Sequence, residues 1–251
     1  MFQKKGQFTI FIILGLVLLI IVGFVLFVLR DTGDLDLNEI KSLDTSLDSV
    51  NSYVKSCLES TAIGGLSYVG RHGGYYNLDN VPSTGTLPYN TAYYFNLGNN
   101  VMPSMATVEN ELASYIDDNL FFCLENFAFF RSQGLDVSIG EIKSIVSLQD
   151  NVIVNLEMPL DVERNGVKNS LDSFVVTVDT RLKALFDSAV VLTAVQVNDP
   201  ENICMSCIFS EASKNGFVIE LSNMGDDTVV ISMMDEVSEE YLIYANRYVT
   251  I

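Results

Sequence analysis

The sequence predicts an α+β protein that begins with one membrane-spanning helix. Residues 8–29 form a run of 22 residues without a charged side chain. The next third of the chain repeats apolar residues every three or four positions, as amphipathic helices do. The remainder alternates apolar and polar residues between turn signals, as antiparallel strands do. We therefore expect a transmembrane helix, two long disulfide-linked helices, and a mainly antiparallel sheet with one crossing helix.

The apolar run at 8–29 is long enough to cross a bilayer. At about 1.5 Å per residue it covers the roughly 30 Å hydrocarbon core. Lys4 and Lys5 precede it and acidic residues follow it, so the positive-inside rule places residues 1–7 in the cytoplasm and residues 36–251 outside the cell. Because no small-residue cleavage site follows the run, we expect it to remain as a signal anchor in the cell membrane.

The chain start resembles two groups of archaeal proteins. The stretch that carries the resemblance is Lys4-Lys5-Gly6-Gln7-Phe8-Thr9-Ile10-Phe11-Ile12-Ile13. It looks like the start of uncharacterised single-pass surface proteins of small-genome (DPANN-type) archaea. It is also similar to the class III signal of archaeal type IV pilin-like proteins, which a peptidase cuts between Gly and Gln, and this implies processing between Gly6 and Gln7. The pilin pattern has Glu at the fifth mature position, where this chain has Phe11.

Two long helices follow a polar hinge at 30–35. Apolar residues at three- and four-residue spacing predict a helix over 36–70, which three glycines end. A second helix is expected over 104–131, with Ser104 or Thr107 as its cap and acidic residues in its first turns. Gln133-Gly134 ends this helix and gives the one candidate boundary inside the extracytoplasmic domain, near residue 134.

Residues 75–103 predict a long surface loop with one strand at 92–95, because Pro, Gly and Asn recur there. The loop carries five tyrosines, Tyr75, Tyr76, Tyr89, Tyr93 and Tyr94. Tyrosine stacks and hydrogen-bonds well, so this loop is a candidate contact surface for protein or glycan. The alternative is that these rings anchor the loop to the domain.

The rest of the chain predicts strands and a third helix. The expected strands cover 142–148, 152–160, 173–178, 217–221, 228–233 and 241–249. Asn165-Gly166 is a strong hairpin signal, and apolar spacing predicts a helix over 182–193. Asp226-Asp227 after Gly225 reads as a turn, with a Ca²⁺ site as an alternative.

The four cysteines suggest two disulfides. Cys57 and Cys123 lie on the apolar faces of the two long helices in similar settings, Ser-Cys-Leu-Glu and Phe-Cys-Leu-Glu, so we predict a bridge between them, with free thiols as the alternative. The Cys-Leu-Glu segments and the His72-Gly-Gly-Tyr turn also resemble the archaeal surface proteins. Cys204 and Cys207 form a C-x-x-C, predicted as a local disulfide, with a redox dithiol, a metal site or free thiols as alternatives.

The composition of the chain narrows the range of possible functions. The chain has 14 Lys and Arg against 32 Asp and Glu, which disfavours nucleic acid as a partner and favours basic proteins or divalent cations. The alternative is that the acidic excess serves only to keep the protein soluble. His72 is the single His, and its place at a helix end explains it without catalysis. No familiar catalytic motif occurs, so we expect no enzyme and no cofactor.

These patterns predict a membrane-anchored extracellular structural or interaction protein of the cell envelope. It would self-assemble or contact other surface proteins. A pilin-like filament subunit cleaved before Gln7 is one alternative, and an extracytoplasmic thiol–disulfide protein using Cys204 and Cys207 is another.

Overall fold

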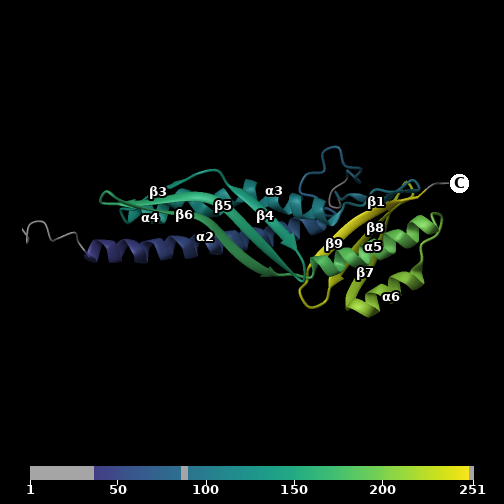
Figure 1. The fold of residues 1–251 in the computed structure, drawn as a ribbon. Helices are drawn as coiled ribbons and strands as arrows, with labels where there is room; N and C mark the ends of the chain where they lie inside the picture. Colours follow the sequence, from purple (N-terminus) through teal and green to yellow (C-terminus); the bar gives the residue numbers. More distant parts are fainter. Residues whose placement is uncertain (1–36, 86–89, 249–251) are drawn as a thin grey trace, which may run out of the picture. The chain divides into compact units, whose positions relative to one another are not determined.

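The computed structural model describes residues 37–85 and 90–248 (Figure 1). The chain divides into two compact units, Met1–Asp48 and Ser49–Ile251. The predicted span at 8–29, the hinge at 30–35 and the Gly6–Gln7 pair lie outside the described residues. Within the described ranges, no helix has both the length and the apolar character needed to cross a bilayer.

The two long helices form as the periodicity predicts. Helix α2 covers Leu37–Arg71 and helix α3 covers Met105–Leu124. The buried residues of α3 recur every fourth position and form one stripe, namely Val108, Leu112, Ile116, Leu120 and Leu124. Its first turn is capped by Ser104, whose hydroxyl accepts a hydrogen bond from the Thr107 amide at 3.1 Å. A side-chain cap of this kind satisfies an amide that has no partner inside the helix.

The second helix is shorter than the expected 104–131. It ends at Leu124, and a 3₁₀ turn at Glu125–Phe127 leads into the short helix α4, Ala128–Ser132. Glu125, Asn126 and Phe127 have φ values of 44°, 52° and 54°, a left-handed conformation that is unfavourable for residues with a side chain. The turn packs the rings of Phe127 and Phe130 around Tyr53 of α2, with centroids 6.0 and 5.4 Å away. Aromatic burial therefore offsets the local strain.

The first sheet is antiparallel and has β5, Asn151–Arg164, at its centre. Strand β6, Val167–Asp179, pairs along one edge of β5, and β3, Asp136–Ile139, and β4, Lys143–Leu148, share the other edge. Alternate residues of β5 are buried on one face, from Val152 to Val162. Asn165 and Gly166 both have positive φ, 53° and 83°, which confirms the predicted tight hairpin.

Proline explains why β3 and β4 are separate strands. Pro159 lies in the central strand β5 and has no amide hydrogen to give to a neighbour. The register of β5 with β6 shifts between Glu157 and Leu160. On the other edge, Gly140 donates its amide to the Pro159 carbonyl at 2.7 Å. The interruption at one proline therefore affects the pairing along both edges of β5.

Helix α3 protects the edge strand β4. Asp117 Oδ1 accepts the Ser144 amide at 2.7 Å, and Glu109 Oε1 accepts the Leu148 amide at 2.8 Å. The two carboxylates are eight residues apart on the helix, a rise of about 12 Å, and the two amides are four residues apart on the strand, a rise of about 13 Å. The spacing of the acceptors therefore matches the spacing of the donors. These carboxylates satisfy edge amides that would otherwise be free to pair with another chain.

The second sheet has the order β2-β1-β9-β8-β7. Its strands are β1 (Tyr93–Asn96), β2 (Asn99–Asn100), β7 (Phe217–Gly225), β8 (Thr228–Asp235) and β9 (Tyr241–Arg247). All neighbours are antiparallel except β1 and β9, which are parallel. The early strand β1 therefore completes a sheet whose other long strands come from the end of the chain.

Two helices accompany the second sheet, where the sequence predicted one. Helix α5, Leu182–Asn198, contacts β1, β8 and β9, and helix α6, Met205–Asn215, contacts β7 (Figure 1). In the residues that the structure describes, the expectation of a single sheet with one crossing helix is thus corrected to two sheets, the second accompanied by two helices. The α+β class itself is confirmed.

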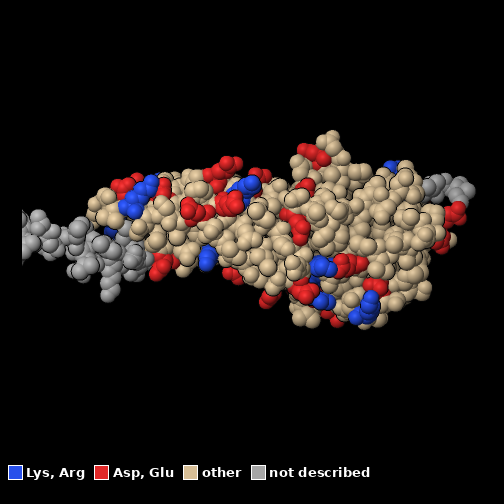
Figure 2. All heavy atoms as spheres, in the orientation of Figure 1, with Lys and Arg blue, Asp and Glu red and all other residues tan. Residues whose placement is uncertain are grey.

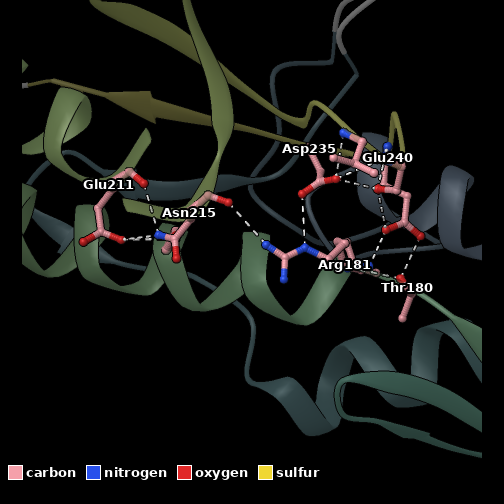
Figure 3. Close-up of polar contacts among 10 residues, drawn as sticks. Thr180, Arg181, Glu211, Asn215, Asp235 and Glu240 are labelled. Atoms are coloured by element: carbon pink, nitrogen blue, oxygen red, sulfur yellow. Dashed lines mark hydrogen bonds and ion pairs between the residues drawn. The ribbon is translucent and has the colours of Figure 1, made fainter. Parts of the chain in front are cut away.

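A polar network fixes the segment between β6 and α5 to the turn between β8 and β9 (Figure 3). Thr180 Oγ1 donates to Glu240 Oε1 at 2.7 Å, and the Arg181 amide donates to the other oxygen of Glu240. Arg181 Nε donates to Asp235 Oδ2 at 3.1 Å. Burial opposes ionisation of Asp235, but hydrogen bonds from Ser238, Arg181 and Val237 together lower its pKa. The network holds the junction between the two sheets.

Candidate functional site: an aromatic and acidic pocket

Four aromatic rings gather where helix α2 ends. Tyr68 and His72 lie four residues apart on α2 and stack with ring centroids at 4.1 Å. Tyr115 of α3 lies 5.5 Å from Tyr68, and Tyr76 lies edge-on to Tyr115 at 5.2 Å. Residues four apart face the same side of a helix, so these rings, which we call the aromatic cluster, form one continuous surface.

The turn that follows α2 is held in one conformation. Gly73 and Gly74 have φ values of 70° and 89°, which glycine adopts without steric cost. Glu111 of α3 then accepts the amides of Tyr76 and Asn77 on one carboxylate oxygen, at 2.8 and 3.0 Å. Charge-assisted hydrogen bonds of this kind are stronger than neutral ones. The backbone that carries Tyr76 is therefore anchored to a rigid helix.

An open pocket of about 420 Å³ lies against the aromatic cluster. It is lined by Tyr68, His72, Tyr76, Asn77, Leu78, Asp79, Asn90 and Asp118. Asp79 and Asp118 are exposed, and neither carboxylate has a hydrogen bond or ion pair among the described residues. No Lys or Arg is among the residues that line it. We call this site the aromatic–acidic pocket.

Asn90 forms part of the pocket wall. Its Oδ1 atom is buried and has no hydrogen-bond partner in the described part of the chain. A buried carbonyl oxygen without a donor is costly and uncommon in folded proteins. This oxygen has almost no accessible surface, so it belongs to the wall of the pocket and not to the acceptors that a ligand would reach.

His72 is oriented by the helix that carries it. Its Nδ1 lies 2.7 Å from the Tyr68 carbonyl oxygen, so the ring donates from that nitrogen and keeps Nε2 for other contacts. The stack with Tyr68 fixes the plane of the imidazole. These contacts give His72 a packing role in the aromatic cluster.

The structure separates the five tyrosines of the predicted contact loop. Tyr76 lines the pocket, and Tyr75 is half-buried, where burial and the nearby Glu111 raise its pKa. Tyr93 and Tyr94 are 9% and 0% exposed, so their assignment to a contact surface was wrong. Both belong to β1, which enters the second sheet, and Tyr94 stacks on the buried Tyr244 at 4.3 Å. Tyr89 lies outside the described residues.

Sequence reasoning missed three members of the site: Tyr68, Tyr115 and Asp118. Their signal was present, because Tyr68 shares a helix face with His72, and Tyr115 and Asp118 are three residues apart on the second helix. What the sequence lacked was the packing of α2 against α3, which brings the two faces together.

The predicted bridge between the long helices is confirmed. Cys57 and Cys123 form a disulfide with Cα atoms 5.6 Å apart. The hydroxyl of Tyr53, one turn earlier on α2, donates to the Cys123 carbonyl at 2.9 Å. The bond joins positions 66 residues apart, so it locks the helices that carry the aromatic cluster.

The second pair, Cys204 and Cys207, is also joined by a disulfide. Both residues are half-buried, and Cys204 caps helix α6 by accepting the Cys207 amide on Sγ at 3.3 Å. The pair opens a helix, as redox dithiols do, but the element before it is helix α5 and not a strand. The local disulfide fits its capping position, and redox activity stays a prediction.

Asp226 and Asp227 form the turn between β7 and β8. Their φ values are 48° and 55°, and the Asp227 carbonyl accepts the Tyr248 amide at 2.9 Å. In the ranges that the structure describes, no group of three or more His, Cys, Asp or Glu side chains is placed to hold a metal ion. The turn reading of this pair therefore has direct structural support.

The surface carries acidic side chains on both sheets and on the helices. Figure 2 shows Asp and Glu spread over the visible face, with separate Lys and Arg among them and no extended basic patch. Comparisons with family models, curated proteins and solved structures find no match for this chain.

Proposed function

We propose that this chain is a membrane-anchored extracellular protein of the cell envelope that binds a protein partner or a second copy of itself. The observation that carries the proposal is the aromatic–acidic pocket. It combines partly exposed rings, unpaired carboxylates and a backbone fixed by Glu111. Preorganised aromatic and polar surfaces of this kind are typical of recognition sites.

The disulfides support an extracellular location. Such bonds persist in oxidising compartments and are rare in the cytosol. Residues 8–29 would provide the anchor, with residues 1–7 in the cytoplasm and the folded unit outside. The strong acidic excess of the chain fits an exposed, soluble surface unit with no affinity for nucleic acid.

Binding is a better explanation of the pocket than catalysis. General acid–base and nucleophilic catalysis need a base within hydrogen-bond reach of a nucleophile and oriented by a third group. His72 is the single His of the chain, and none of the described residues that line its pocket is a Ser, Thr, Cys or Lys that could act as a nucleophile. We therefore propose a non-enzymatic protein that needs no cofactor.

The intact mass of the chain isolated from membranes tests this proposal. It should be measured without reduction and then with reduction and thiol labelling, after protease treatment of intact cells in a parallel sample. A mass that begins at Met1, four protected cysteines and loss of the folded unit to external protease are expected. A chain that external protease cannot reach would contradict the proposed location.

A filament subunit is the second candidate function. It is favoured by α2, which is 35 residues long and begins a few residues beyond the predicted span. Joined to that span, such a helix would suit lateral packing of identical subunits in a filament core. A mature mass that starts at Gln7, together with filaments lost on Gly6→Leu, would favour this candidate.

A further inference from the structure

We infer that the aromatic–acidic pocket binds the guanidinium group of an arginine side chain presented by a partner protein. The inference rests on the proposed function, because it names the chemistry of the partner at the same site. Three features of the pocket carry it: its hydrogen-bonding character, its aromatic wall and its charge.

The pocket presents acceptors that have no donors. The carboxylates of Asp79 and Asp118 are exposed and have no partners among the described residues. Asn77 Oδ1, by contrast, already accepts the Asp79 amide at 2.7 Å. A ligand that fits must bring several N–H groups and no acceptor. Guanidinium carries five donors in a planar fork, and it cannot lose its charge in a protein.

The aromatic cluster supplies a surface for a flat cation. Tyr68 is 39% exposed, while its stack with His72 at 4.1 Å holds the ring in place. Guanidinium packs against tyrosine faces through cation–π attraction and is less strongly hydrated than ammonium. The same pocket therefore offers a stacking surface beside carboxylates that can each accept two hydrogen bonds.

Charge favours a cation over a neutral ligand. The pocket lining includes two carboxylates and neither Lys nor Arg, and the whole chain carries a formal net charge of −18. A neutral sugar would leave the carboxylates uncompensated. A metal ion would need more ligands than the described residues bring together. An arginine on a basic protein surface satisfies the charge, the donors and the stacking at once.

Peptide binding to the full-length chain in detergent tests the inference. The probes are an acetylated and amidated Gly-Arg-Gly peptide and its citrulline counterpart, which keeps the shape of arginine and lacks its charge. We expect saturable binding of the arginine peptide by NMR or calorimetry. The citrulline peptide should bind at least about tenfold more weakly, and added salt should weaken the arginine complex.

Matched variants link the binding to the pocket. Asp79→Asn combined with Asp118→Asn should weaken arginine binding about tenfold, since each exposed pair contributes a few-fold. Asp172→Asn, an exposed carboxylate on β6, should leave it unchanged. Equal binding of arginine and citrulline peptides, preference for a lysine peptide or a disaccharide, or equal effects of the two sets of variants would overturn the inference.

The two proposals fail in different measurements. If the purified chain ignores the arginine peptide but external protease removes the folded unit from cells, only the guanidinium inference is wrong. If the peptide binds through Asp79 and Asp118 but the unit is not accessible outside the cell, the proposed extracellular function is wrong and the chemistry of the pocket stands.

Discussion

The disulfide between Cys57 and Cys123 should make a much larger contribution to stability than the one between Cys204 and Cys207. In the chain-entropy model, a crosslink removes more freedom from the unfolded chain as the closed loop grows. The two bonds have sequence separations of 66 and 3. The model then gives about 4 kcal/mol for the first and about 2 kcal/mol for the second. For a unit of this size, the first loss corresponds to a fall in Tm of roughly 10 °C.

Urea and thermal unfolding of the full chain in detergent would measure this difference. Cys57→Ala with Cys123→Ala is compared with Cys204→Ala and Cys207→Ala, so that each variant loses one bond and two sulfur atoms. Cys57 is 3% exposed, so its replacement also leaves a cavity. Wild-type protein unfolded with and without a reductant separates the crosslink from that cavity.

The decisive result is which of the two double variants loses more free energy of unfolding. If removal of the Cys204–Cys207 bond destabilises the chain as much as removal of the Cys57–Cys123 bond, loop closure does not govern these disulfides. If reduction alone changes nothing while the Cys57→Ala pair destabilises, the cavity and not the crosslink is responsible.

Three further predictions concern packing and pH. Asp117→Ala should lower the free energy of unfolding by about 1 kcal/mol, because an edge amide of β4 loses its acceptor, whereas Asp117→Asn keeps an acceptor there. Burial raises the pKa of Asp117 despite its hydrogen bonds to Ser144. The contribution of Asp117 to the free energy of unfolding therefore decreases as pH rises through that raised pKa. Urea unfolding at a series of pH values should show this decrease for the wild type and not for Asp117→Asn. The pKa of Asp235 is lowered in the folded state. Its contribution to stability is therefore complete above the pKa of an unfolded Asp and is lost as pH drops through the pKa of the folded state. Asp235→Asn should make the free energy of unfolding less dependent on pH in the acidic range. A Cβ atom at position 70 would lie 2.2 Å from the Tyr241 carbonyl oxygen, whereas one at Gly64 would have ordinary contacts. Gly70→Ala should therefore lower the Tm, and Gly64→Ala should raise stability by up to about 1 kcal/mol; a loss of equal size in both variants would contradict this.

Local patterns were sufficient for most of the secondary structure. The apolar spacing over 36–70 predicted α2 within one residue at each end, because an amphipathic stripe of ten turns leaves little ambiguity. Asn165-Gly166 predicted the β5–β6 hairpin, since both residues adopt positive φ readily. The pairing of Cys57 with Cys123 followed from similar positions on two helices that had to pack together.

Helix α6 escaped prediction because its buried side is partly polar. Glu211 is 9% exposed and accepts hydrogen bonds from Ser188 Oγ and Asn215 Nδ2, both at 3.1 Å (Figure 3). A charged residue at a core position erases the apolar periodicity by which a helix is recognised. Its partner Ser188 lies on α5, so only the packed structure supplies the compensation.

The candidate site was likewise predicted in part from the sequence and decided in part by tertiary packing. The sequence by itself determined most of the helices and strands, and it identified the tyrosine-rich loop, because these properties depend on neighbours within a few residues. Only the tertiary structure decided that Tyr93 and Tyr94 are buried in β1, and that Tyr68, Tyr115 and Asp118 meet Tyr76 near one pocket. Those outcomes depend on contacts between residues far apart in the chain, and such contacts leave no periodic trace in the sequence.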